Sequence, residues 1–312
     1  MSRRSRPVWV YVLLSGLLGV FLLGLWLGGA PSPEQGKVPG EPAHTVQQKE
    51  PAAPAVVFEE TGHESVAPAP EEEAMPAPPA EHHGIALILD DVGYDLPALH
   101  RALALHLPLT IAILPESPHA AKAAELAHKA GYPVMLHMPM EPANPRYSKK
   151  MDDSFIRVGM KREEVRRLMN GALVKVPYVV GVNNHMGSRL TALEQPMRWV
   201  MEVCREQKLF FVDSRTNKDS VAARLAREAG LRWGQRRVFL DDSVQPELLE
   251  KSWNAARKRL KRDGSVIVIA HPHHETLDFL EHKLTRADRA SMVPISALLV
   301  REEAKLGDIA GR

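Results

Sequence analysis

The sequence predicts an α/β fold in which a parallel sheet closes into a barrel of about seven strand-helix units, and two observations favour this fold. After residue 83, short runs rich in Val, Ile and Leu alternate with amphipathic stretches, which is typical of a parallel sheet covered by helices. Nearly every apolar run ends in Asp or His. In a barrel such ends converge on one mouth, whereas in an open sheet they are strung along an edge with about 4.8 Å between strands.

The elements follow from hydrophobic periodicity. Continuous apolar runs predict strands at 85–89, 109–114, 133–138, 178–184, 209–213, 236–241 and 265–271. Apolar residues at helical spacing predict helices at 119–131, 161–176, 219–230 and 246–264. Together these elements make up a domain over residues 83–312.

Residues 1–30 are expected to form a membrane anchor. Arg3, Arg4 and Arg6 precede the run 8–29, which is long enough to span a bilayer and holds no charge. The basic residues favour a cytoplasmic N-terminus. A cleaved signal peptide is the alternative, although its apolar region is usually only about 7 to 15 residues long. Either interpretation exports the domain, and we expect a single span in a bacterial inner membrane with the domain in the periplasm or another extracytoplasmic space.

Residues 31–82 are expected to be a disordered linker. Positions 31–80 hold eleven prolines, nine glutamates and only two lysines, a composition that buries too little apolar surface to fold. The whole chain has a net charge of +2 and no basic block, so no nucleic-acid partner is predicted. A single cysteine, Cys204, provides no intramolecular disulfide for an exported domain.

The first strand ends in two adjacent carboxylates, Asp90 and Asp91. Two buried like charges are costly unless a cation or hydrogen-bond donors compensate them. Other strand ends carry His137, His185, Asp213, Asp241, Asp242, His271 and His273. Asp241 and Asp242 precede a serine and a helix and are expected to cap or turn the chain. Imidazoles and carboxylates around one mouth suit a hydrolytic Zn²⁺ site, with one carboxylate as general base and a separate histidine as general acid.

Several motifs resemble those of the NodB-type polysaccharide deacetylases, namely "LILDDVG", "GYPVMLHMPME", "FFVDSRT" and "VIVIAHP". The combination of "DDVGY", "LHMPMEP", "NNHMGS" and "HPHHETL" is most similar to their divergent, YibQ-like branch. The resemblance covers about residues 84–300. It implies a (β/α)7 barrel, a divalent metal that is usually zinc, and hydrolysis of N- or O-acetyl groups on polysaccharides.

Matched position by position, the resemblance implies a role for each of five residues. Asp90 matches the catalytic base, and Asp91 matches a metal ligand. His137 matches the first of two metal-binding histidines. His271 matches the general acid, and Asp213 matches an acidic residue that supports the catalytic groups.

The chain departs from the family pattern at two places. Glu141 stands where the second metal-binding histidine is expected, and "NNHMGSR" replaces an arginine and proline motif. Either His185 supplies the missing nitrogen ligand, which is the favoured interpretation, or Glu141 binds through oxygen. Further ligands or substrate contacts are expected from His273, Asn184 and Arg189.

The sequence therefore predicts a metal-dependent hydrolase that removes acetyl groups from an envelope polysaccharide or a peptidoglycan-related glycan. The alternative is a non-catalytic envelope protein that binds glycan or a cell-wall partner through a weakened site. A metal-dependent phosphoesterase would use similar ligands, but the sequence contains no Gly-rich phosphate cradle. Metal content and acetate release distinguish the enzyme from the binding protein.

Overall fold

The computed structural model describes residues 83–149 and 151–300 of the chain. The predicted anchor and linker lie outside these residues. Within the described part, no helix is both long and apolar enough to cross a membrane.

The strands of the described residues form one parallel sheet. They are β1 (Gly84–Val92), β2 (Leu109–Ile113), β3 (Val134–Met140), β4 (Val179–Met186), β5 (Phe210–Asp213), β6 (Trp233–Gln235), β7 (Val238–Phe239) and β8 (Ser265–Ala270). Their order in the sheet is β6-β5-β4-β3-β2-β1-β8-β7. The first strand of the domain is therefore an inner strand, since β1 pairs with both β2 and β8.

The sheet curls, and its two edges are formed by neighbouring segments of the chain. β6 pairs with β5 and β7 pairs with β8, and only Arg236 and Arg237 separate β6 from β7. The backbone N–H of Arg236 donates to the Asp213 carbonyl, and that of Arg237 donates to the Ile267 carbonyl. The sixth predicted strand, 236–241, corresponds to the shorter β7, and β6 before it was not predicted because "WGQ" is not an apolar run.

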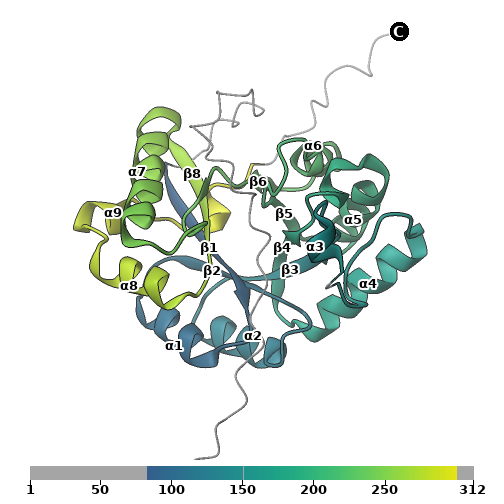
Figure 1. The fold of residues 1–312 in the computed structure, drawn as a ribbon, viewed down its shortest axis with the longest axis horizontal. Coiled ribbons are helices and arrows are strands. Elements are labelled where there is room, and N and C mark those ends of the chain that lie inside the picture. Colours follow the sequence, from purple (N-terminus) through teal and green to yellow (C-terminus); the bar gives the residue numbers. More distant parts are fainter. Residues whose placement is uncertain (1–82, 150, 301–312) are drawn as a thin grey trace, which may run out of the picture. The chain divides into compact units, whose positions relative to one another are not determined.

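Helices surround the curled sheet on its outer side (Figure 1). Those of the described residues are α1 (Leu96–Ala104), α2 (Ala120–Lys129), α3 (Pro145–Ser148), α4 (Arg162–Lys175), α5 (Glu194–Glu206), α6 (Ala222–Glu228), α7 (Pro246–Asp263), α8 (His274–His282) and α9 (Arg286–Ser291). The four predicted helices are confirmed as α2, α4, α6 and α7. Local signals define their ends, since Asp95 caps α1 through the N–H of Ala98 and Gly264 ends α7 with a φ of 77°.

The two faces of the sheet follow the alternation of side chains along each strand. In β1, Ile85, Leu87 and Leu89 belong to a large core cluster that includes the helices. Ala86 and Ile88 belong to a second cluster, made by the inner face of the curled sheet. Counting in steps of two along a strand therefore tells which side chains point to the inside of the curl.

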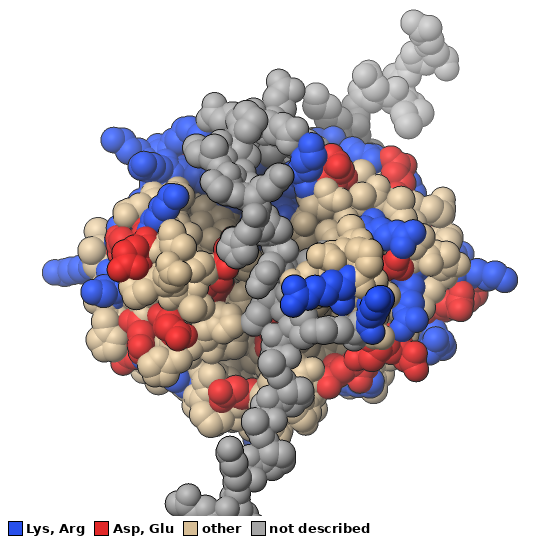
Figure 2. Space-filling view, in the orientation of Figure 1, with Lys and Arg blue, Asp and Glu red and all other residues tan. Residues whose placement is uncertain are grey.

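Both signs of charge are spread over the face of the domain shown in Figure 2. Ion pairs join several helices, as Arg162 of α4 with Glu202 of α5 at 2.7 Å and Arg101 of α1 with Glu281 of α8 at 2.6 Å. Solvent-exposed pairs of this kind each contribute about 0 to 1 kcal/mol. Stability therefore comes mainly from the two apolar clusters.

Replacing Gly93 by alanine is expected to lower the free energy of unfolding by roughly 2 to 4 kcal/mol. Gly93 follows β1 with a φ of +124°, and an added Cβ would lie 1.9 Å from Oγ of the buried Ser117. The matched control is Gly171→Ala inside α4, where an added Cβ meets no atom within 4 Å. That control is expected to stabilise the protein by up to about 1 kcal/mol. Urea unfolding of both variants checks the contrast, and equal stabilities would contradict it.

Candidate metal centre and acid-base site

The carboxylate doublet reaches one cavity because the backbone at Asp91 leaves the strand conformation. Asp90 continues the inward series of Ala86 and Ile88, whereas Asp91 would by alternation point outward. Asp91 has a φ of 57°, and the pairing register of β1 with β2 shifts between Leu89 and Val92. This left-handed residue at a bulge turns the second carboxylate inward. Both carboxylates consequently line the same cavity at the carboxyl ends of the strands.

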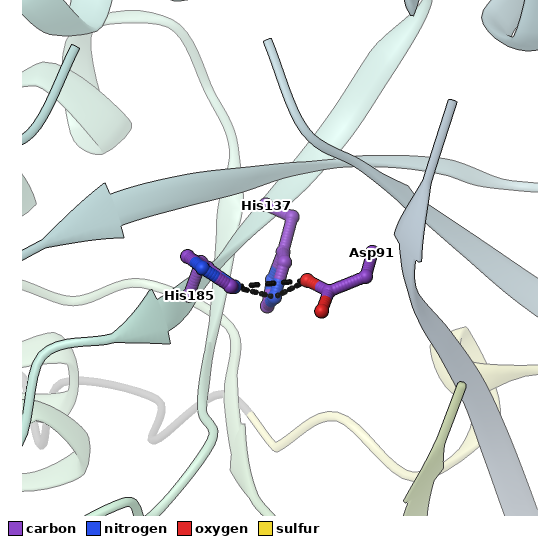
Figure 3. A group of neighbouring side chains, drawn as sticks. All are labelled: Asp91, His137 and His185. Atoms are coloured by element: carbon purple, nitrogen blue, oxygen red, sulfur yellow. Dashed lines mark hydrogen bonds and ion pairs between the residues drawn. The ribbon is translucent and has the colours of Figure 1, made fainter. Parts of the chain in front are cut away.

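Asp91 meets His137 of β3 and His185 of β4 in this cavity (Figure 3). Oδ1 of Asp91 lies 3.0 Å from Nε2 of His137 and 2.9 Å from Nδ1 of His185. The two imidazole nitrogens are 3.2 Å apart. All three side chains are buried. The residues predicted as metal ligands are thus brought together by the fold, His185 included.

The hydrogen bonds of His137 show that this group suits a cation. Nδ2 of Asn183 donates to both oxygens of Asp90, so Oδ1 of Asn183 faces Nδ1 of His137, at 2.9 Å, and accepts its proton. In a neutral imidazole, Nε2 of His137 then carries a lone pair directed at Asp91. Both buried oxygens of Asp91 are without a hydrogen bond of good geometry. Two nitrogens and one carboxylate facing one another fit the donor set of a catalytic zinc site.

Asp90 and Asp91 have different electrostatic environments. Burial raises the pKa of Asp90 above its ordinary value, although His137, His271 and the Asn183 amide oppose the shift. Burial acts on Asp91 too, but His185 and His137 outweigh it and hold the pKa of that carboxyl well below its ordinary value. A pair of carboxyls whose pKa values move apart can divide ligand and base roles. Asp90 is the better proton acceptor of the two.

His271, directly after β8, is held by a carboxylate that was expected to be a cap. Oδ1 of Asp241 lies 3.0 Å from Nδ1 of His271, and Oδ2 accepts from the backbone N–H of His271 and from Oγ1 of Thr276, at 2.7 Å each. The expectation that Asp241 only caps or turns the chain was therefore wrong. Burial lowers the pKa of His271, but Asp241, Asp91 and Asp90 together outweigh burial and raise it to about 9.

Asp241→Asn is expected to move the alkaline limb of the activity profile to lower pH. A general acid works while protonated, so its contribution is present below its pKa and is lost as pH rises through it. The carboxylate of Asp241 raises the pKa of His271, and the neutral amide does not. We also expect turnover to fall by roughly 10- to 100-fold because His271 loses its anchor. Rates of acetate release between pH 6 and pH 10 check this, and an unshifted limb would contradict it.

Glu141 does not lie in the group of Asp91, His137 and His185, so the structure does not place it where the missing histidine was expected. Its Oε1 accepts from Nη1 of Arg189 at 2.6 Å, and its Oε2 accepts from the backbone N–H of Val158 at 2.7 Å. Its backbone pairs with Ile156 and with the turn at Arg189. Glu141 therefore ties the segment after β3 to the segment after β4, and Arg189 is its partner in that link.

Glu141→Gln is expected to leave the bound metal unchanged, at the wild-type stoichiometry and with an affinity within about threefold. The substitution keeps an acceptor for Arg189 or Val158 and removes only a charge that the metal group does not use. Zinc titration with a competing chromophoric chelator measures the affinity. A loss of stoichiometric zinc would restore Glu141 as a ligand.

The other predicted site residues take different positions. Asp213 points away from the inside of the curl, like Phe211, and accepts hydrogen bonds from the Arg215 N–H and from Oγ of Ser220. It does not line the cavity and lies near Arg236, so the supporting role that the resemblance implies for it stays a prediction. Asn184 lines the cavity and holds Ser214. His273 lies beside His271, with ring centroids 5.8 Å apart.

The residues of the site that were not predicted from the sequence as its members include Asp241, Ser214 and Arg236. Ser214 and Arg236 line the cavity with the doublet, and Asp241 supports His271. The alternation of side chains could have indicated two of them. Ser214 lies two residues beyond Val212, whose side chain belongs to the inner cluster. Asp241 lies two residues beyond Phe239, which packs on the same cluster. Arg236 adjoins the division between β6 and β7, which the sequence pattern did not indicate.

The curled parallel sheet and its buried Asp–His–His group define an α/β protein with a candidate metal site at the carboxyl ends of its strands. Residues 87–299 match the family described as divergent polysaccharide deacetylase. The chain belongs to this family, which confirms the resemblance seen in the sequence.

Two relatives and one solved structure are similar to this chain. The chain is 36% identical over 197 residues to the uncharacterized protein YibQ of Escherichia coli, covering 63% of this chain and 61% of that protein. It is also 36% identical to an uncharacterized protein of Haemophilus influenzae, covering 63% of this chain and 69% of that one. An uncharacterized protein of Agrobacterium tumefaciens shares the fold, with a TM-score of 0.65 at 19% identity, covering 72% of this chain and 92% of that chain.

Proposed function

We propose that this protein is a metal-dependent hydrolase that removes acetyl groups from an envelope polysaccharide or a peptidoglycan-related glycan. The observation that carries the proposal is the buried group of Asp91, His137 and His185, with Asp90 and His271 beside it in one cavity. A non-catalytic glycan-binding protein would have no need of a base and an acid held in place by Asn183 and Asp241. Membership of the deacetylase family supports the same reaction.

Asp91, His137 and His185 would hold a divalent cation, which we propose to be Zn²⁺. When bound, it would polarise the acyl carbonyl and lower the pKa of a water molecule. Asp90 takes a proton from the attacking water. The bond between the acyl carbon and the sugar nitrogen or oxygen then breaks, and protonated His271 gives its proton to the leaving group. Acetate and a free amine or hydroxyl result, and proton exchange with solvent resets Asp90 and His271.

We propose that the protein works on the outer side of a bacterial inner membrane. The support is in the sequence alone, where an uncharged run at 8–29 follows three arginines and a Pro/Ala/Glu-rich stretch follows the run. A tethered hydrolase could reach glycan beyond the membrane surface. Fusing alkaline phosphatase after residue 82 tests the topology, since that enzyme is active only when exported.

The function is tested by metal content and acetate release together. The purified full-length chain is analysed for bound metals and then incubated with N-acetylchito-oligosaccharide, O-acetylated xylan and purified peptidoglycan. We expect about one divalent ion per chain and release of acetate from one of these glycans. Chelation should abolish the release, and added Zn²⁺ should restore it. A chain that holds no stoichiometric ion and releases no acetate would overturn the proposal.

A further inference from the structure

The cavity at the metal group is small and has two kinds of wall. Its volume is about 50 Å³, equal to roughly three to five water-sized spheres of 10 to 15 Å³. A sugar ring with its substituents does not fit this space, but an acyl group with three non-hydrogen atoms does. One part of the wall holds the carboxylates and imidazoles, and the remainder includes Met186, Phe239, Ile269 and Ser214. A group that projects into this space faces the acyl carbon and not the sugar.

Ser214 is held rigidly at this wall. It follows β5 and continues the inward series of Phe210 and Val212. Its backbone N–H donates to Oδ1 of Asn184 at 2.9 Å, and its carbonyl accepts from Nε of Arg236 at 2.5 Å. Asn184 is itself fixed, because its Nδ2 donates to the Met186 carbonyl at 2.7 Å. Side chains thus hold the serine backbone on both sides.

The hydroxyl of Ser214 has no hydrogen-bond partner among the residues that the structure describes. Ser214 is 4% exposed, and its buried Oγ neither donates nor accepts. A buried hydroxyl without a partner is expected to cost about 1 to 3 kcal/mol. The other cavity hydroxyl, that of Thr216, donates to the Met186 carbonyl at 2.9 Å. Ser214 therefore carries an unpaired hydroxyl at a residue that lines the cavity, where a ligand or a water molecule can supply the partner.

We propose that Ser214 is a catalytic residue whose hydroxyl donates a hydrogen bond to the carbonyl oxygen of the acyl group. This inference rests on the proposed function. Attack of water forms a bond to the acyl carbon and moves an electron pair of the C=O bond onto oxygen. The Ser214 hydroxyl stabilises that charge without transferring its proton, and the pair returns when the bond to the sugar breaks. A donor on a backbone that is already held in place needs little reorganisation as the charge develops.

Ser214→Ala in the zinc-loaded full-length chain tests the proposal with two readouts. Turnover of 4-nitrophenyl acetate and of N-acetylchito-oligosaccharide is expected to fall roughly 10²-fold, mainly in kcat. The affinity for acetate, measured by calorimetry, is expected to fall roughly 3- to 10-fold. Zinc stoichiometry should stay at the wild-type value, and the melting temperature should stay the same or rise, because the substitution removes a buried hydroxyl that has no partner among the described residues. Ser214→Gly removes the same hydroxyl and should show the same losses.

The matched control is Ser291→Ala, whose Oγ donates to the Asp288 carbonyl at 2.7 Å and which does not line the cavity. It should leave turnover and acetate affinity unchanged. If the wild type holds zinc and releases acetate while Ser214→Ala matches Ser291→Ala in both readouts, the role of Ser214 is wrong and the proposed function stands. If the wild type neither holds zinc nor releases acetate, the proposed function fails, and the role of Ser214 fails with it.

Discussion

Asp91→Asn is expected to remove the bound divalent ion and to lower acetate release by more than about 10³-fold. Asp91 contributes the only carboxylate of the Asp91, His137 and His185 group. An amide in its place has no negative charge to balance that of a divalent cation. Beside the two imidazole nitrogens it would place either an N–H₂ group, which cannot bind a cation, or a neutral oxygen, which binds it more weakly. Metal analysis of the purified variant and the rate of acetate release measure the two losses.

Asp95→Asn is the matched control for this substitution. It makes the same chemical change four residues further along, at the N-cap of α1, where Oδ1 of Asp95 accepts from the N–H of Ala98 at 2.8 Å. Asparagine caps helices about as well as aspartate. The control should therefore keep metal, activity and stability. Retention of stoichiometric metal by Asp91→Asn would show that the ion, if any, is bound elsewhere.

Asp90→Asn is expected to keep the bound ion and to lower turnover by roughly 10²- to 10⁴-fold, the usual contribution of a general base. The amide has nearly the same shape as the carboxylate, and its oxygen can still accept from Nδ2 of Asn183, which leaves the bond between Asn183 and His137 in place. What is lost is the ability to take up a proton. Metal content and single-turnover acetate release separate this outcome from that of Asp91→Asn. If Asp90→Asn loses the metal while Asp91→Asn keeps it, the two roles are reversed.

The strands and helices were predictable because their apolar periodicity is strong. Runs such as 85–89 and 265–271 are buried on both faces of the sheet, so nearly every residue is apolar. β6 is three residues long and contains a glycine and a glutamine. Its place in the sheet comes from pairing with β5, a long-range contact that leaves no local pattern.

The candidate site was predictable where a polar residue ends a strand, as for His137, His185 and His271. The structure groups His185 with Asp91 and leaves Glu141 in a separate link to Arg189. The spacing from His137 along the sequence could not show whether His185 or Glu141 is the ligand, because their positions in space depend on how β3 and β4 pair. Asp241 was predicted to be a cap because it precedes a serine and a helix. The neighbouring sequence is the same whether the carboxylate caps a helix or holds His271.

The position of β1 between β2 and β8 has a consequence for biosynthesis. The strand that carries Asp90 and Asp91 leaves the ribosome first, but one of its two neighbours is made some 170 residues later, at 265–270. Until then the edge of β1 that will pair with β8 offers unpaired backbone groups to other chains. Contacts of such sequence separation form slowly. A nascent or truncated chain that stops before residue 265 would therefore be prone to aggregate, and it would lack Ile269 and His271 of the cavity wall.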